Sequence, residues 1–336
     1  MNDNNSKENE WNPGSLLETS GYYWKTCALH AGVKLDIFSI IGKSWLTAKE
    51  IADGLESGER GVAMLLNALT AMGLLIKKEG KFSNTISAIT FLSRESPQYT
   101  GYIIMHHHHL VESWSRLDQA VASGNPVRKE AVTGDETRRE SFLMGMFNIA
   151  INIAPGVAER IDLSGKRRLI DLGGGPGTYA IHFCLRNPEL KATVHDLPTT
   201  RPFAEKTIKK FNVADRIKFM DCDYLTEEIQ GRFDVAWISH ILHAEGPDTC
   251  RNIITKTVGA LDPGGMIIIH DFLLENSMDG PLFPALFSLN MLLGTESGQS
   301  YSEKQIMDML KDSGVKDIRR IRFKGPNDSG IISGVV

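Results

Sequence analysis

The chain has few cysteines and no long apolar run. Its four cysteines stand far apart without a C-x-x-C pair, so a thiolate zinc site is not expected. We expect reduced thiols in a cytoplasmic setting instead. No apolar run approaches the roughly 20 residues that span a bilayer. Residues 1–11 also lack the charged-then-apolar pattern of a signal peptide. We therefore expect no membrane association.

The chain also lacks an excess of positive charge. Its formal net charge of −4 argues against a generic nucleic-acid surface, and we predict no nucleic-acid partner. With 336 residues, 42% of them hydrophobic, the chain is long enough for two domains with buried cores. We place these domains at residues 1–130, which are mainly helical, and at residues 131–336, where strands and helices alternate.

A third absence concerns the glycine-rich stretch at residues 168–179, which reads as a buried strand, a tight turn and the start of a helix. A dinucleotide fingerprint needs G-x-G-x-x-G, but after Gly173 and Gly175 the third glycine is replaced by Thr178. The pattern present is Asp-x-Gly-x-Gly-x-Gly, beginning at Asp171. A carboxylate this close would disfavour a pyrophosphate and favour a ligand that carries an amino group and a sulfonium charge.

A second acidic residue points to the same cofactor. Asp196 ends the next predicted strand, about where a carboxylate accepts hydrogen bonds from ribose hydroxyls. Asp171 and Asp196 together therefore favour S-adenosylmethionine. A turn that only packs helix on strand, and a nicotinamide-dependent oxidoreductase, stay open as alternatives.

The N-terminal region is predicted to be helical. Apolar residues recur at helical spacing over residues 13–41, a length that suggests two abutting helices. Their apolar surface needs cover from the rest of the chain or from a partner subunit. Helices at residues 46–55 and 59–72 precede a hairpin at residues 74–82, as in a winged helix-turn-helix. Residues 57–60 offer one arginine against one glutamate, so a scaffold or dimerisation role is favoured over DNA binding.

Four consecutive histidines, residues 106–109, lie within a helix predicted at residues 99–123. His106 and His109 share one face of this helix, so at most a pair could bind one metal ion. We expect one or two of these histidines to line a pocket instead, and we assign no metal. His109 is our candidate for a contact with the substrate. Another helix is predicted at residues 135–161, with Met146 on its apolar side.

The remaining sequence predicts an α/β fold. Helices separate predicted strands at residues 169–172, 192–195, 217–220, 233–238 and 266–270, an alternation typical of a doubly wound, mostly parallel sheet. A hairpin of residues 315–323 and 330–336 would add an antiparallel strand. Ligands bind such sheets beyond the carboxyl ends of the strands. The candidate residues there are Asp223, Tyr224, Ser239, His243 and Asp271.

Methyl transfer from a sulfonium is an in-line displacement that needs alignment and a deprotonated acceptor. A phenol has a pKa of about 10, so a nearby base would raise its reactive fraction. His243, just past a strand end, is the best-placed base, and Asp271 could orient its imidazole. For a lone histidine a structural role is the alternative interpretation.

These residues resemble the S-adenosylmethionine-dependent small-molecule O-methyltransferases of the acetylserotonin, caffeic acid and hydroxyneurosporene type. The resemblance extends from about residue 24 to residue 330. It rests on Trp114, Leu117, Val121, Gly124, Phe142, Gly145, Met146 and residues 171–177, 195–198, 223–224 and 239–243.

The resemblance implies a Rossmann-like class I methyltransferase sheet, with an N-terminal all-α winged-helix domain that forms a homodimer. It implies that the methionine part of the cofactor lies on Gly173 and Gly175. It assigns the ribose and adenine to Asp196, Leu197, Asp223 and Tyr224, and places Ser239 beside the cofactor. Met146 and Asn290 would contact a small-molecule acceptor, and His243 would be the general base.

Two departures from the family pattern concern this base. The family usually follows its histidine with aspartate and tryptophan, where Ala244 and Glu245 stand here. Plant-type enzymes have a glutamate where this chain has Ser300, which cannot orient an imidazolium as a carboxylate does. Nitrogen, sulfur or carbon as acceptor atom therefore stays open, as does help from His109 or His240. A cofactor-binding regulator is the alternative from another class.

Overall fold

The computed structural model describes residues 11–128, 136–323 and 325–336. The chain divides into two compact units, Met1–His108 and His109–Val336. The boundary predicted between residues 130 and 131 stays a prediction, because it falls among residues outside the described ranges. The predicted start of a helix at residue 135 lies outside them too.

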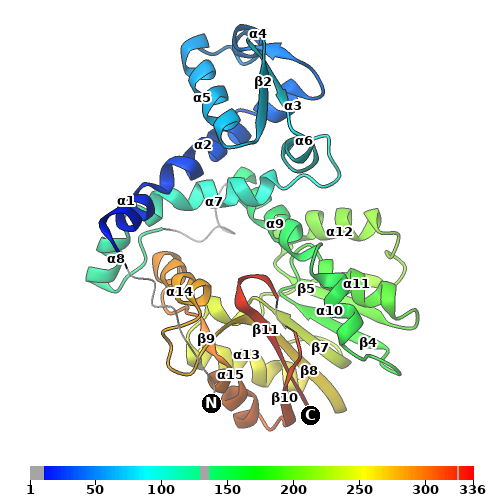
Figure 1. Cartoon of the computed structure of the whole chain (residues 1–336). Coiled ribbons are helices and arrows are strands. Elements are labelled where there is room, and N and C mark those ends of the chain that lie inside the picture. Colours follow the sequence, from blue (N-terminus) through cyan, green and yellow to red (C-terminus); the bar gives the residue numbers. More distant parts are fainter. Residues whose placement is uncertain (1–10, 129–135, 324) are drawn as a thin grey trace, which may run out of the picture. The chain divides into compact units, whose positions relative to one another are not determined.

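The first unit is mostly helical and carries a small sheet in addition (Figure 1). The three strands pair in the order β1-β3-β2, so the description as all-α is incomplete. Its elements are α1 (Pro13–Gly21), α2 (Tyr23–Lys34), α3 (Ile37–Ile41), β1 (Leu46–Thr47), α4 (Ala48–Gly54), α5 (Glu59–Ala71), β2 (Leu75–Lys78), β3 (Lys81–Asn84), α6 (Ile86–Leu92) and the start of α7 (Gly101–Trp114).

The local signals of this unit predicted most of its elements. Thr47 caps α4 in a reciprocal capping box with Glu50, and the β2–β3 hairpin is confirmed. The stretch over residues 13–41 forms three helices rather than the two that its length suggested. Asp36, with φ 57°, has a left-handed backbone conformation that interrupts the helix between α2 and α3.

The second unit is built on one mixed sheet. Its strand order is β10-β11-β8-β7-β4-β5-β6, and β9 pairs with β8. The strands are β4 (Arg168–Leu172), β5 (Lys191–Asp196), β6 (Ile217–Asp221), β7 (Phe233–Ser239), β8 (Leu261–Leu274), β9 (Tyr301–Ser302), β10 (Lys316–Ile321) and β11 (Ser329–Val335). The helices are α8 (Leu117–Ser123), α9 (Glu136–Ala150), α10 (Ala154–Arg160), α11 (Thr178–Arg186), α12 (Arg201–Lys210), α13 (Pro247–Gly259), α14 (Leu282–Gly294) and α15 (Glu303–Asp312).

The predicted parallel sheet with an antiparallel end is confirmed. Strands β4 to β8 pair in parallel, and β11 runs antiparallel to both β8 and β10. Two predicted helices are interrupted. Residues 99–123 break between α7 and α8, where Ser113 and Ser115 bond to carbonyls of the preceding turn. Residues 135–161 break ahead of Pro155, which lacks the N–H that a helix interior needs.

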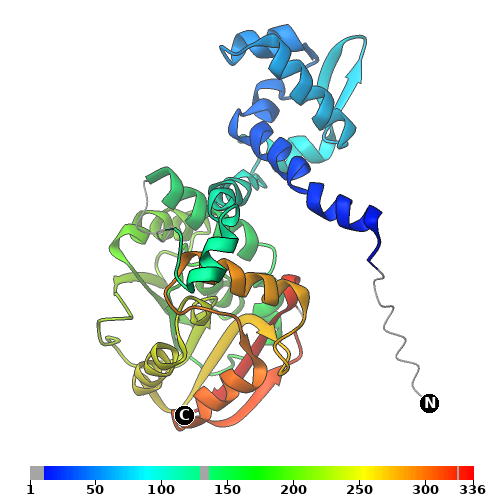
Figure 2. The ribbon, with the colours of Figure 1, turned by 90° about the vertical axis from the view of Figure 1, so that its left-hand side faces the viewer.

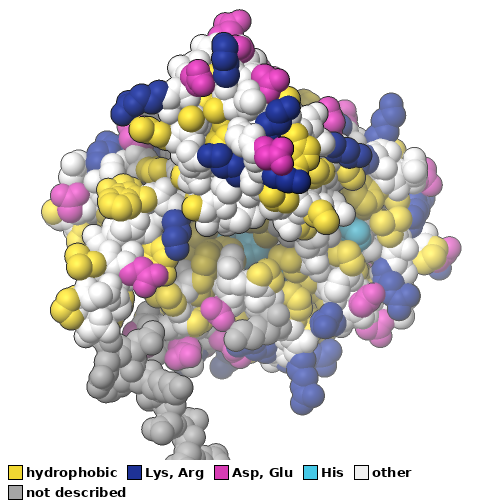
Figure 3. All heavy atoms as spheres, turned by 45° about the horizontal axis from the view of Figure 1, so that its top comes forward, with side chains coloured by type: hydrophobic (Ala, Val, Ile, Leu, Met, Phe, Trp, Pro, Cys, Tyr) yellow, Lys and Arg dark blue, Asp and Glu magenta, His cyan; other side chains and the backbone are white. Residues whose placement is uncertain are grey.

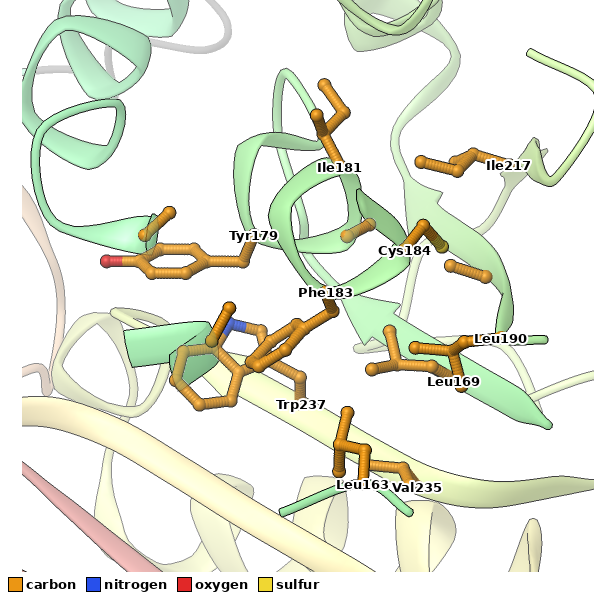
Figure 4. Close-up of a cluster of buried hydrophobic side chains, with 14 of the residues drawn as sticks. Leu163, Leu169, Tyr179, Ile181, Phe183, Cys184, Leu190, Ile217, Val235 and Trp237 are labelled. Carbon is orange, nitrogen blue, oxygen red and sulfur yellow. The ribbon is translucent and has the colours of Figure 1, made fainter. Parts of the chain in front are cut away.

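Side chains of the central strands alternate between two cores. Leu169 and Trp237 face α10, α11 and α12, whereas Ile170 and Ile238 face α13 and α15. The ribbon of this unit, with helices on both faces of the sheet, is drawn in Figure 1 and turned by 90° in Figure 2. In the first core the rings of Tyr179 and Phe183 lie against Trp237, with ring centroids 5.0 Å apart in each pair (Figure 4). This packing fixes α11 on the sheet directly after the glycine loop.

Within the described ranges, no helix taken singly has the length and apolar composition of a membrane span. The bent pair α9 and α10 meets that criterion jointly.

Candidate active site

The glycine loop between β4 and α11 needs glycine for two different reasons. Gly173 and Gly175 have φ of 60° and 54°, in the left-handed region that favours glycine. A Cβ on Gly173 would overlap Ile241, whereas no atom lies within 4 Å of the place where a Cβ on Gly175 would stand. The first glycine therefore allows close packing. The second leaves open space above the loop, as cofactor binding requires.

Asp171 lies beneath this loop. It is 1% exposed, and its Oδ2 accepts a hydrogen bond from the Ala180 amide in the first turn of α11, at 3.2 Å. Burial raises the pKa of Asp171 to about 7. Its position therefore supports the loop, and a direct contact with the cofactor stays a prediction.

Asp196 connects the glycine loop to the end of β5. Its Oδ2 accepts from the Gly175 amide at 2.8 Å, and its Oδ1 accepts from the Leu197 amide at 2.7 Å and the Thr200 hydroxyl at 3.0 Å. Burial raises the pKa of Asp196, and these three hydrogen bonds oppose that rise. A carboxylate offers about four acceptor positions, so one remains for a ribose hydroxyl.

Asp223 and Tyr224 follow β6, next in the sheet. Both carboxylate oxygens of Asp223 accept hydrogen bonds within its own turn, from the Leu225 amide at 3.0 Å and the Thr226 hydroxyl at 2.9 Å. A Cβ on Gly173 would lie 3.3 Å from Cε1 of Tyr224, so this aromatic ring stands beside the loop. The structure therefore brings the predicted cofactor residues from three strand ends together.

Ser239 ends β7 and pairs with a buried histidine that the sequence interpretation did not use. Its hydroxyl lies 3.0 Å from Nδ1 of His270, whose Nε2 lies 3.2 Å from the Ser329 hydroxyl. Burial holds the pKa of His270 well below its usual value, so this imidazole is neutral at pH 7.

His243, in the short 3-10 turn Leu242–Ala244 that follows β7, forms a buried pair with Asp271 within β8. His243 Nδ1 lies 2.7 Å from Asp271 Oδ1, and His243 is 9% exposed. Burial alone would raise the pKa of Asp271, but His243 and His240 outweigh it and hold that pKa well below its usual value. An ionised Asp271 accepts the proton of Nδ1, which leaves Nε2 as the basic atom of His243.

His240 shares the same carboxylate. Its Nδ1 lies 3.5 Å from Asp271 Oδ1, its φ is 56°, and its ring packs on Phe272 with centroids 4.4 Å apart. Ligand atoms of His240, His243 and Asp271 lie within 4.8 Å of one another, a spacing that could hold a metal ion. The hydrogen bond between His243 and Asp271 accounts for their closeness without one, and the absence of a metal stays a prediction.

Aromatic rings that the sequence interpretation missed surround His243. Phe272 lies parallel to the imidazole with centroids 5.9 Å apart, and Phe287 meets it edge-on at 4.8 Å. Phe283 stacks on Phe287 in turn, at 5.9 Å. The signal was present, because Phe283, Phe287 and Asn290 stand four and three residues apart and so share one face of α14. These rings form an apolar wall beside His243.

Asn290 lies on that wall. It is 8% exposed, and its Oδ1 accepts from Trp114 Nε1 at 3.3 Å and from Arg128 Nη1 at 3.0 Å. Met146 is half-buried on α9 and His109 is half-buried on α7. The acceptor contacts predicted for these three residues stay predictions.

Ser300 does not act as a partner of the base. It is fully buried, and among the described residues its hydroxyl has no hydrogen-bond partner. Its amide donates to Ser288 at 3.0 Å. The acidic partner of His243 is therefore Asp271.

A cavity of about 320 Å³ lies at the opposite edge of the sheet. It is lined by the first residues of β4 and the loops beside them, and the ion pair of Arg168 with Asp234, at 2.9 Å, lies within it. Because these charges neutralise each other and the strand carboxyl ends lie elsewhere, this cavity is not a candidate active site.

Comparisons with known proteins identify the family of the chain. Residues 114–316 match the O-methyltransferase domain family, and residues 17–94 match the O-methyltransferase dimerisation domain. A 3-hydroxy-5-methyl-1-naphthoate 3-O-methyltransferase from Streptomyces sahachiroi is 32% identical over 96% of this chain and 95% of its own. An L-tyrosine C(3)-methyltransferase from Streptomyces lavendulae is 26% identical over 90% of this chain and 87% of its own.

A solved structure shares the fold. Human N-acetylserotonin methyltransferase in complex with SAM superposes with a TM-score of 0.86, at 23% identity, over 97% of this chain and 99% of its own. The expected class I methyltransferase fold with an N-terminal dimerisation domain is thereby confirmed. Since the matched domain covers more than half of the chain, this protein belongs to the S-adenosylmethionine-dependent O-methyltransferase family.

Proposed function

We propose that this enzyme methylates a hydroxyl of a small aromatic or conjugated molecule, with His243 as general base. The observation that carries this proposal is the 2.7 Å contact between His243 Nδ1 and Asp271 Oδ1, which leaves Nε2 to accept a proton. S-adenosylmethionine supplies the electrophilic methyl group. The wall of Phe272, Phe283 and Phe287 suits a flat acceptor whose hydroxyl reaches Nε2.

In this proposal the proton of the acceptor hydroxyl passes to His243 Nε2, and the ionised Asp271 stabilises the imidazolium. Nε2 has no hydrogen-bond partner among the described residues. The cofactor would lie on Gly173 and Gly175, with its ribose on Asp196 and Leu197. Its adenine would lie by Asp223 and Tyr224, and Ser239 and the supporting Asp171 would complete the site. Met146, Asn290 and His109 would contact the acceptor.

Another acceptor atom is the second candidate. Ala244 and Ser300 stand where the family has acidic residues, and a relative is named for methylation at carbon. A weaker base assembly suits an acceptor that ionises more readily than a phenol. A regulator that binds the cofactor and uses a winged helix remains the alternative from another class.

We also infer that α1 and α2 pair with a second copy of the chain. The α1 helix has no buried residue, and Leu17, Tyr23 and Trp24 are 74%, 61% and 70% exposed in the single chain. Large apolar side chains exposed next to one another mark an interaction surface. Leu17, Tyr23 and Trp24 all fall within the matched dimerisation domain. Sedimentation velocity should give a dimer that the Trp24→Ser variant weakens.

Cytoplasmic location and the absence of a nucleic-acid partner stay predictions. The four cysteines are free thiols, which suits a reducing compartment. On the face drawn in Figure 3, basic and acidic side chains are interspersed, whereas a nucleic-acid surface gathers basic side chains.

The test of the general base is methyl transfer from labelled S-adenosylmethionine to a panel of phenols, amines and thiols. We expect His243→Gln to lower kcat about a hundredfold or more, because general-base catalysis contributes roughly 10²–10⁴-fold. Cofactor affinity, measured by calorimetry, should stay unchanged. Undiminished turnover in His243→Gln would remove the general-base assignment.

A further inference from the structure

Lys256 lies half-buried on α13 and binds the loop between β6 and β7. Its Nζ donates hydrogen bonds to the carbonyls of Tyr224 at 2.6 Å, Glu227 at 2.8 Å and Leu225 at 3.4 Å. An ammonium has three N–H donors, so these three carbonyls can occupy all of them. All three partners are neutral backbone groups of one short segment.

This arrangement differs from that of a lysine that stabilises its own helix. Lys49, for example, pairs at 3.0 Å with Asp53 one turn further along α4, where 67% and 65% of the two side chains are exposed. Four residues before and after Lys256 stand Asn252 and Ala260, so α13 offers no carboxylate at that spacing. The carbonyls that Lys256 binds most closely lie 29 and 32 positions away in the sequence. Its contacts are therefore tertiary.

The loop that Lys256 binds is shaped mainly by Asp223. The Asp223 carbonyl accepts hydrogen bonds from the amides of Thr226 at 3.1 Å and Glu227 at 2.8 Å. The Asp223 carboxylate accepts from the Leu225 amide and the Thr226 hydroxyl. All four bonds lie within residues 223–227, so they close the turn without attaching it to the rest of the protein.

Lys256 attaches this turn to a fixed helix. The buried side chains of Ile253 and Ile254 hold α13 on the sheet. The carbonyls of Tyr224 and Glu227 lie near the two ends of the turn, so the ammonium holds both ends at once. Since the Tyr224 ring stands beside the glycine loop, a hold on its backbone also sets the position of the turn relative to that loop.

The carboxylate of Asp223 has capacity for a ligand. Two of its roughly four acceptor positions are used within the turn, which leaves about two. The exocyclic amine of adenine is a donor that such a carboxylate can bind. An ionised carboxylate has no donor of its own, so an oxygen at the same place on the purine would gain no hydrogen bond from it. The turn can therefore distinguish a 6-amino purine from a 6-oxo purine.

We propose that Lys256 is a positioning residue for the adenine of S-adenosylmethionine, because its ammonium holds residues 223–227 where Asp223 meets the exocyclic amine. This rests on the proposed placement of the adenine beside Asp223 and Tyr224. In this role Lys256 contacts the turn and not the cofactor. It governs cofactor affinity and the preference for adenine, and it takes no part in proton transfer at His243.

The test compares S-adenosylhomocysteine with S-inosylhomocysteine, in which an oxygen replaces the exocyclic amine. Affinities are measured by calorimetry for the full-length wild type and for Lys256→Met, which keeps an apolar stem and removes the ammonium. We expect the wild type to bind S-adenosylhomocysteine more tightly. Lys256→Met should weaken S-adenosylhomocysteine about tenfold, the scale of one lost hydrogen bond to a charged group, and S-inosylhomocysteine much less.

Two further variants separate positioning from folding. Lys256→Arg keeps the charge and several donors, and it should retain most of the preference for adenine. Lys311→Met makes the same change at an exposed position of α15 and should alter neither affinity. Unchanged affinities in Lys256→Met, or equal losses for the two ligands, would overturn the positioning role.

Steady-state kinetics distinguish this proposal from the proposed general base. Lys256→Met should raise the KM for S-adenosylmethionine about tenfold, in line with the lost affinity, with little change in kcat at saturating cofactor. A kcat lowered as far as in His243→Gln would contradict a role confined to the cofactor. Equal binding of both ligands by the wild type would contradict the adenine placement at Asp223, whereas failure of the base assignment would appear only in His243→Gln.

Discussion

Replacing Asp171 with asparagine should make the stability of the cofactor-free enzyme less dependent on pH. The carboxyl is 1% exposed, and burial raises its pKa from 3.8 to about 7. Folded Asp171 therefore keeps its proton to higher pH than the unfolded chain does. The folded state binds more protons between about pH 4 and 7, so its stability falls as the pH rises through that window.

The magnitude follows from the two pKa values. The carboxyl has a pKa of 3.8 in the unfolded chain and about 7 in the folded one. This difference lowers the unfolding free energy of the wild type by about 2.5 kcal/mol between pH 5 and pH 8. The variant has no carboxyl here and lacks this loss. Asparagine keeps the shape and the oxygen that accepts from Ala180. The unfolding free energy of the variant, relative to that of the wild type, should therefore be higher at pH 8 than at pH 5.

Urea unfolding at both pH values, followed by tryptophan fluorescence, to which the fully buried Trp237 contributes, measures this difference. Histidines with lowered pKa, such as His195 and His270, add the opposite slope in both proteins, and subtraction removes it. Asp118→Asn, at an exposed site, is the control. Identical pH slopes in Asp171→Asn and the wild type would refute a protonated, buried Asp171.

Two further predictions concern the loop and the base. Gly175→Ala should weaken cofactor binding at least tenfold, because its Cβ enters open space above the loop. Gly165→Ala is the control. It imposes similar left-handed backbone strain of about 1–2 kcal/mol at a distant turn and should leave cofactor affinity unchanged. Titration with the cofactor measures both affinities. Equal affinities in the two variants would contradict the placement of the cofactor on Gly175. Asp271→Asn should lower kcat on the order of 10³–10⁴-fold, since an amide can leave the wrong nitrogen of His243 protonated. His240→Asn, which tolerates the positive φ, should lower kcat far less in the same assay, and equal losses would mean that His240 is as important as the carboxylate.

The sequence predicted the parts of the site that depend on local pattern. The Asp-x-Gly-x-Gly spacing specified the turn after β4, and the end of β7 located Ser239 and His243, because parallel strands end at one edge of a sheet. The predicted strand end before Asp271 was wrong, because β8 continues to Leu274 in its pairing with β11 and β9. Partners that lie far apart in the chain were not predictable. Arg128 meets Asn290 across 162 positions, and His270 meets Ser329 across 59. The burial of Asp171 likewise depends on how α11 packs.

The pairing of β11 with β8 affects the order in which the folded enzyme forms. Strand β11 pairs with β8 along its whole length, with Gly330 opposite Asp271 and Ile331 opposite His270. A nascent chain that has not yet released β11 would expose Ile267 to Ile269 on an open strand edge, which invites aggregation. Asp271, which we propose orients the base, would also lack its neighbour Gly330. Competence for methyl transfer would therefore wait for β11 to be synthesised, well after the cofactor loop has emerged.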